Sequence, residues 1–213
     1  MDTNFQKSNN VLPALISVIG WCAVFLQFYL IIENRVASVG ETVIRFFSFF
    51  TILTNILVSI CFTTLWLKPK NKWELFFLNN KTQTAITLYI VIVGLVYNLI
   101  LRFLWAPVGF QKIADEILHS VIPLLVLLFW FLFTYKKNLV FRDILPWLLY
   151  PFLYLVYILI RGHFYNFYPY PFIDVNQLGY KTVLMNSFFM VLAFLIIGIL
   201  LIGISKIVSK SNG

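Results

Sequence analysis

Six long runs of apolar residues constrain the fold of this chain more than any other feature of its sequence. About 20 apolar residues in a helix cross the hydrocarbon core of a bilayer. Runs of about this length cover residues 11–32, 46–67, 83–104, 113–135, 144–161 and 182–205. Because 61% of the residues are hydrophobic and 11% are charged, one soluble core would not bury this apolar surface. We therefore predict an all-α polytopic membrane protein, in which residues 1–213 form a single domain, a bundle of six transmembrane helices.

The basic residues predict how this bundle is oriented in the membrane. The net charge of +8 comes from 16 Lys and Arg against 8 Asp and Glu. Many of the basic residues fall in the connections at 68–81 and 136–142 and near the two ends of the chain. The positive-inside rule therefore predicts that both termini are cytoplasmic. The basic excess is then a signal of topology, and we expect no nucleic-acid partner. The Lys-, Asn- and Phe-rich composition is compatible with a bacterial plasma membrane.

One histidine lies inside the fourth apolar run. His119 is the only group from Ile117 to Tyr135 that titrates near neutral pH. An ionisable side chain inside a membrane helix is costly, and such residues are commonly functional. The alternative is that His119 only forms a hydrogen bond with a neighbouring helix.

Other polar residues gather near the predicted depth of His119. Counting inward from Lys112 and from Arg45 places His119 and Thr51 at about 10 Å below the outer surface. Further polar side chains fall in the outer half of the bundle, namely Gln27, Asn98, Arg102, Arg161 and Asn186. The inner half has little beyond small hydroxyl groups. This asymmetry predicts a polar pocket that opens toward the outer leaflet, because a pore would need polar residues at successive depths.

Thr51 and His119 are the candidate catalytic residues. A Thr hydroxyl becomes an effective nucleophile when a His within hydrogen-bond reach removes its proton. Asp115 or Glu116, about one turn nearer the surface, would orient the imidazole of His119 and stabilise its charged form.

Four further polar residues are candidates for supporting the reaction. Asn55 or Asn98 would donate a hydrogen bond to a developing oxyanion. Arg102 or Arg161 would hold a carboxylate of the substrate.

The connection at residues 162–180 is rich in Tyr, Phe and Pro. An aromatic belt at the membrane surface is the ordinary explanation of such a segment. The alternative is a lid over a lipid-facing opening, with His163 and Asp174 as supporting residues of the site. The two histidines and the carboxylates near them also suggest a metal site, but they lack the HxxxH spacing of a typical zinc motif. We expect neither a metal nor a cofactor.

Three stretches of the sequence resemble the androgen-induced membrane hydrolases and their bacterial six-span relatives, the Pr-six-Pr integral membrane proteins. These stretches are FFTILTN around Thr51, LHSVIPLL around His119, and GHFYNFYPYPFID at residues 162–174. In the hydrolase branch an intramembrane Thr and His split fatty acid esters of hydroxy fatty acids. The resemblance implies Thr51 as the nucleophile and His119 as the base. The chain departs from the animal enzymes in the position of the proline after the histidine and in having Thr54-Asn55 where they have an acidic residue.

Three functional interpretations follow from these features. The first is an intramembrane hydrolase of a lipid-like ester, with the bilayer and a lipid or fatty acid ester as its partners. The second is a non-enzymatic lipid-binding or transport protein, in which His119 is a protonation switch. In the third, the polar residues only hold the helices together, at about 1 kcal/mol for each hydrogen bond. The sequence does not indicate an oligomeric state.

Overall fold

The computed structural model describes residues 10–104 and 106–211, and within these ranges the chain folds into helices and contains no strand. Six helical segments are long and apolar enough to cross a membrane, which confirms the predicted six-helix fold of a multi-pass integral membrane protein. They are α2 (Val11–Glu33), α4 (Phe50–Leu67), α6 with η1 (Asn80–Phe103), α7 to α8 (Gly109–Phe133), η3 to α10 (Phe141–Tyr165) and α11 (Val175–Ser211).

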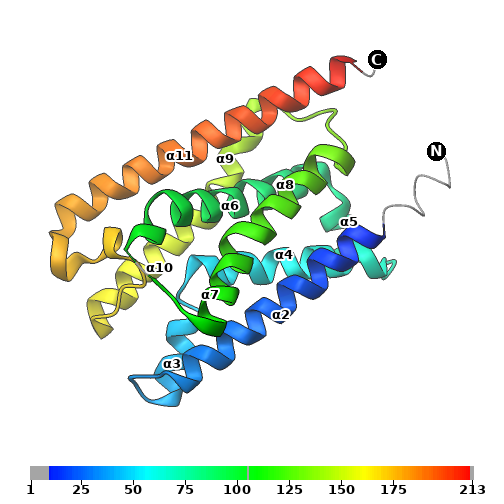
Figure 1. Ribbon diagram of the computed structural model, residues 1–213. Coiled ribbons are helices and arrows are strands. Elements are labelled where there is room, and N and C mark those ends of the chain that lie inside the picture. The colour runs from blue at the N-terminus through cyan, green and yellow to red at the C-terminus, as the bar shows by residue number, and fades with distance from the viewer. Residues whose placement is uncertain (1–9, 105, 212–213) are drawn as a thin grey trace.

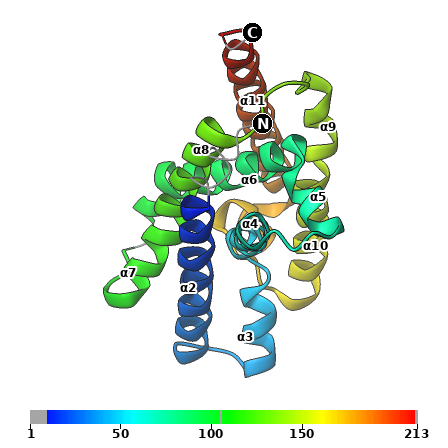
Figure 2. The ribbon, with the colours of Figure 1, turned by 90° about the vertical axis from the view of Figure 1, so that its right-hand side faces the viewer.

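The second and third spans form the centre of the bundle. Figure 2 shows α4 between α2 and α10 (Leu149–Tyr165). The span of α4 and that of α6 (Asn80–Leu99) are the most buried of the six. The start of α2 and the end of α11 lie at the same end of the bundle (Figure 1), as an even number of spans requires. A short helix, α5 (Lys72–Leu78), connects α4 to α6 at that end.

The second apolar run forms two helices separated by a short non-helical stretch. α3 (Val39–Phe46) is followed by Ser48, whose hydroxyl donates to the Ile44 carbonyl at 2.7 Å. α4 then begins at Phe50, so the prediction of one helix from residue 46 was wrong. The depth of about 10 Å predicted for Thr51 assumed one continuous helix from Arg45, so that value does not apply. Thr51 instead lies in the first turn of α4, where backbone N–H groups have no partner within the helix.

The fourth span changes its helical geometry in the middle. α7 (Gly109–Glu116) and α8 (Ile122–Phe133) are joined by η2 (Ile117–Val121), a single π-helical turn. This turn contains His119, so the structure places the histidine at a local irregularity of the helix. Such π-turns are rare and frequently occur at functional sites.

The segment after the fifth span folds back into the bundle. α10 ends at Tyr165, and Asn166 follows in the left-handed conformation, which reverses the chain. Tyr168 then packs on Gly162, where a Cβ atom would overlap its aromatic ring. The absence of a side chain at Gly162 therefore lets this segment lie against α10. It continues through η4 (Pro171–Ile173) into α11.

An ion-pair cluster joins α3 to the end of α10. One oxygen of Glu41 accepts hydrogen bonds from Arg45 Nε at 2.8 Å and from Arg161 Nη2 at 2.6 Å. The hydrogen bond from Arg45 and then that from Arg161 lower the pKa of the Glu41 carboxyl, although burial opposes them. The carboxylate therefore stabilises the fold above its ordinary pKa, and this stabilisation is lost as the pH falls through the lowered value.

We expect Glu41→Gln to lower the melting temperature at neutral pH and to make it less sensitive to acid, because Gln cannot lose the charge that Glu41 loses. Thermal unfolding of both proteins in detergent between pH 7 and about pH 3 measures the difference. The two melting temperatures should converge as the pH falls. A constant difference over the whole range would contradict the assigned role of the carboxylate.

Candidate functional site

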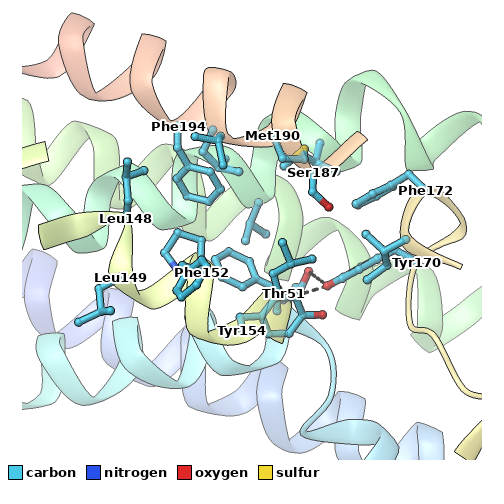
Figure 3. Close-up of a pocket in the computed structure, with 18 of the residues that line it drawn as sticks. Thr51, Leu148, Leu149, Phe152, Tyr154, Tyr170, Phe172, Ser187, Met190 and Phe194 are labelled. Atoms are coloured by element: carbon cyan, nitrogen blue, oxygen red, sulfur yellow. Dashed lines mark hydrogen bonds between the residues drawn. The ribbon is translucent and has the colours of Figure 1, made fainter. Parts of the chain in front are cut away.

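The described residues enclose an apolar cavity of ≈ 500 Å³ between α4, α6, α10 and α11 (Figure 3). Thr51 and Tyr170 lie at one end of the cavity, and Leu148 and Leu149 lie at the other (Figure 3). Hydroxyl groups are contributed to its lining by Thr51, Tyr154, Tyr170 and Ser187. The other lining residues are aliphatic or aromatic, so the cavity suits a hydrocarbon chain with one polar group near Thr51.

The cavity opens on the outside of the bundle between α10 and α11. Phe152 of α10 and Val191 of α11 both line it, and they are 59% and 41% exposed. Both residues belong to helical segments that are long and apolar enough to cross a membrane, so the opening lies on the side of these segments and not at their ends. A lipid chain can therefore reach the cavity without leaving the membrane.

Thr51 is held at the cavity wall by a residue that is distant in sequence. The hydroxyl oxygen of Tyr170 accepts a hydrogen bond from the Thr51 N–H at 3.1 Å and lies 3.3 Å from Thr51 Oγ1. It thus satisfies one of the first N–H groups of α4, which lack helical partners. Burial raises the pKa of Tyr170, so its phenol stays protonated and can donate to Thr51 Oγ1. No sequence pattern distinguishes Tyr170 from the other aromatic residues of its segment.

A row of tyrosines on α10 contacts α4 and the non-helical stretch before it. Tyr150 OH lies 3.2 Å from Thr54 Oγ1, and Tyr154 OH donates to the Ser48 carbonyl at 2.9 Å. Tyr157 OH lies 3.1 Å from Ser48 Oγ. The three tyrosines follow one another at helical spacing, which could have predicted from the sequence that they share one face of a helix.

His119 is oriented by a backbone carbonyl. Its Nδ1 lies 2.9 Å from the Asp115 carbonyl oxygen, and its ring stacks on Tyr97 with centroids 4.0 Å apart. Because a carbonyl only accepts, Nδ1 carries a proton, and in the neutral imidazole Nε2 is then an acceptor. Asp115 thus contacts the ring through its backbone carbonyl, while its carboxylate accepts a hydrogen bond from Gln111 and Glu116 pairs with Arg102.

The two asparagines hold backbone carbonyls that the π-turn and a proline leave without partners. The Ile122 N–H bonds to Ile117, which frees the Leu118 carbonyl, and Pro123 has no N–H for the His119 carbonyl. Asn55 Nδ2 donates to Leu118 O at 3.2 Å and to Thr51 O at 2.9 Å. Asn98 Nδ2 donates to His119 O at 3.1 Å and to Gly94 O at 2.8 Å. Both amides are therefore engaged, and this arrangement does not fit the predicted role of oxyanion donor.

Close helix packing makes these contacts possible. A Cβ atom on Gly94 would lie 3.2 Å from the His119 carbonyl oxygen and 3.0 Å from Pro123 Cβ. A side chain at Gly94 would require these neighbours to shift by a few tenths of an ångström, beside the 3.1 Å hydrogen bond from Asn98 to the His119 carbonyl.

The structure does not pair the two predicted catalytic side chains directly. The Thr51 hydroxyl contacts Tyr170, the His119 ring contacts Asp115 and Tyr97, and these described side chains form no hydrogen bond with each other. Their segments are linked through Asn55, which bonds Thr51 and the residue before His119.

Of the predicted site residues, Thr51 lines the cavity, whereas His119, Asn55, Asn98 and the others do not. Arg102 forms an ion pair with Glu116 at 2.7 Å, and Arg161 forms one with Glu41. His163 Nδ1 lies 3.3 Å from Tyr180 OH on the exposed surface. Asp174 accepts a hydrogen bond from the Asn176 N–H at 2.9 Å, at the start of α11. The contacts of these four side chains are thus with other residues outside the cavity lining.

A metal centre has no support in the described ranges. Within residues 10–104 and 106–211, no three His, Cys, Asp or Glu side chains lie close enough together to hold a metal ion.

The fold and this site define a multi-pass membrane protein with an apolar cavity that opens into the bilayer. The chain matches no protein-family model, no curated protein and no solved structure.

Proposed function

We propose that this protein is an intramembrane hydrolase, which takes a lipid-like ester from the bilayer and cleaves it at Thr51. The single observation that supports this proposal most directly is the position of the Thr51 hydroxyl. It lies in the wall of a cavity whose other surfaces suit an acyl chain. The resemblance to the androgen-induced hydrolases gives the same residue and suggests a fatty acid ester of a hydroxy fatty acid as substrate. We place the protein in a bacterial plasma membrane, with both termini in the cytoplasm.

In the proposed reaction Thr51 Oγ1 attacks the ester carbonyl and Nε2 of His119 takes the hydroxyl proton. The bond to the alcohol oxygen breaks, and the alcohol leaves with that proton. Water then attacks the acyl-enzyme, His119 removes a proton from it, and the carboxylic acid leaves as Thr51 is restored. Tyr170 can donate to Oγ1, so the Thr51 proton stays available for the base. Once Thr51 Oγ1 has bonded to the ester carbon, the same Tyr170 O–H is free to donate to the oxyanion that develops.

The second candidate is a non-enzymatic lipid-binding or transport protein. The observation that favours it is that the Thr51 hydroxyl bonds to Tyr170 and not to His119. Catalysis needs the hydroxyl to turn toward Nε2 when substrate binds, whereas lipid binding needs no such change.

Labelling with a lipophilic fluorophosphonate separates these two functions. We expect an adduct on Thr51, located by mass spectrometry of the modified peptide, and loss of this adduct in His119→Ala. Thr54→Ala is the matched control, because Thr54 is also buried on α4 but contacts Tyr150. Folded protein that forms no adduct, yet still takes up a fluorescent fatty acid, would overturn the hydrolase and support the second candidate.

A further inference from the structure

A second cavity of ≈ 350 Å³ lies beside the C-terminal end of α10. This is the outer end of the helix if both termini are cytoplasmic, as the basic residues predict. Its lining includes Glu41 and Ile44 from α3 and Tyr157 and Arg161 from α10. Ser48 bonds both Tyr157, which lines this cavity, and Tyr154, which lines the Thr51 cavity. The residues around Ser48 thus form the wall between two separate sites.

Arg161 lines this second cavity and carries one donor that forms no hydrogen bond with the described residues. Its side chain is only 5% exposed, and Nη2 donates to Glu41 at 2.6 Å. Nη1 is buried and has no hydrogen-bond partner among the described residues. A buried guanidinium nitrogen without a partner is unfavourable, because water no longer solvates it. An anionic oxygen bound at Nη1 would remove this cost.

The charges around Arg161 also favour an anion. Glu41 and Arg161 line the cavity, and Arg45 pairs with the same Glu41 oxygen from beside it, so this cluster holds two cations and one carboxylate. The Phe167 ring lies under both guanidinium groups, with centroid distances of 4.6 Å for Arg45 and 4.9 Å for Arg161. This stacking fixes their planes while one positive charge remains uncompensated.

The rim of the cavity is apolar and faces outward. Ile44, Ile160 and Phe164 line it and are 49%, 56% and 72% exposed. A free inorganic anion gains nothing from these side chains. An amphiphile would place its anionic group at Arg161 and its hydrocarbon along the rim, so the cavity matches a lipid better than a small ion.

We propose that this cavity is a second lipid site, which binds the phosphate headgroup of an anionic phospholipid at Arg161. The site is separate from the Thr51 cavity, and the proposal does not depend on hydrolysis at Thr51. The phosphate oxygen accepts hydrogen bonds from the guanidinium, and the acyl chains lie on Ile44, Ile160 and Phe164.

Native mass spectrometry of the full-length protein in detergent tests this proposal. Phosphatidylglycerol is titrated against phosphatidylcholine, which has the same chains but a zwitterionic headgroup. We expect phosphatidylglycerol adducts at about tenfold lower lipid concentration than phosphatidylcholine adducts, because the charge-assisted bond requires an anion. Equal binding of the two lipids would overturn the proposal. Competition by inorganic phosphate at the same concentration as the lipid would overturn the assignment to a lipid and leave a small-anion site.

Two variants locate the binding. Ile44→Glu places a negative charge in the cavity lining and is expected to weaken phosphatidylglycerol binding about tenfold. Val39→Glu is the matched control, because Val39 lies on the same helix, is 52% exposed and does not line the cavity. Arg161→Gln should show the same loss as Ile44→Glu if it folds. An Ile44→Glu protein that binds as tightly as Val39→Glu would contradict the proposed position of the headgroup.

Discussion

Thr51→Ala is expected to lower the turnover of a lipid ester by about 1000-fold or more, since it removes the atom that forms the acyl-enzyme. Thr51→Ser should keep part of the activity, because Ser supplies the same oxygen at the same wall of the cavity. Release of fatty acid from a panel of esters, with purified protein in detergent or nanodiscs, measures both effects. Neither variant should reduce the binding of a fatty acid that the cavity holds.

Two neighbouring hydroxyl groups extend this test, Thr54 as the control and Tyr170 as the proposed donor. Thr54→Ala removes a buried hydroxyl on α4 that contacts Tyr150, and turnover should remain within a few-fold of the wild-type value. Tyr170→Phe keeps the ring but removes the donor 3.3 Å from Thr51 Oγ1. We expect turnover to fall about 100-fold, the usual effect of losing one oxyanion donor. If Thr51→Ala retained the wild-type rate, Thr51 would not be the nucleophile, and lipid binding would be the better description of the cavity.

Trp130→Ala is expected to destabilise the fold by about 3 kcal/mol, the range found when a large core side chain is truncated. Trp130 is 1% exposed, and its Nε1 donates to Thr84 Oγ1 at 3.0 Å, which joins α8 to α6. Its ring also lies 4.9 Å from Lys136 Nζ. Truncation therefore leaves a void between two helices and removes the interhelical hydrogen bond to Thr84 Oγ1, which keeps only its bond to the Asn80 carbonyl of its own helix. Because helices in a bilayer associate through packing and hydrogen bonds, both losses weaken the bundle.

The adjacent residue provides the control for Trp130. Phe131 is 52% exposed on the outside of the bundle, so Phe131→Ala removes an aromatic ring that packs against lipid or detergent. We expect its unfolding transition to move much less than that of Trp130→Ala, with thermal unfolding in detergent as the measurement. Equal shifts for the two variants would show that Trp130 is not a packing centre of the bundle.

Part of the candidate site could be predicted from the sequence. Thr51 and His119 were chosen because polar groups in hydrocarbon are costly, and both belong to neighbouring segments that Asn55 joins. The partner of Thr51 could not be predicted. Tyr170 reaches it from a distant segment, and the sequence shows no local pattern for a side chain that caps a remote helix.

The asparagines show a second limit of sequence reasoning. The sequence predicts that Asn55 or Asn98 donates to an oxyanion. In the structure, they donate to the Leu118 and His119 carbonyls, which the π-turn and Pro123 leave without helical partners. Pro123 is visible in the sequence, and its missing N–H frees the His119 carbonyl. The wide turn that frees the Leu118 carbonyl is not visible, because it depends on how α8 packs against its neighbours.

The sequence by itself determined that this is a six-span helical membrane protein. The length and apolarity of a run are local properties, and they decide whether a segment is more stable in lipid than in water. The tertiary structure alone decided which faces of the helices meet, where the two cavities lie and which hydroxyl holds Thr51. The physical reason is that these helices are apolar on all sides. Their rotation is therefore set by packing and by a few interhelical hydrogen bonds, which involve residues far apart in the chain.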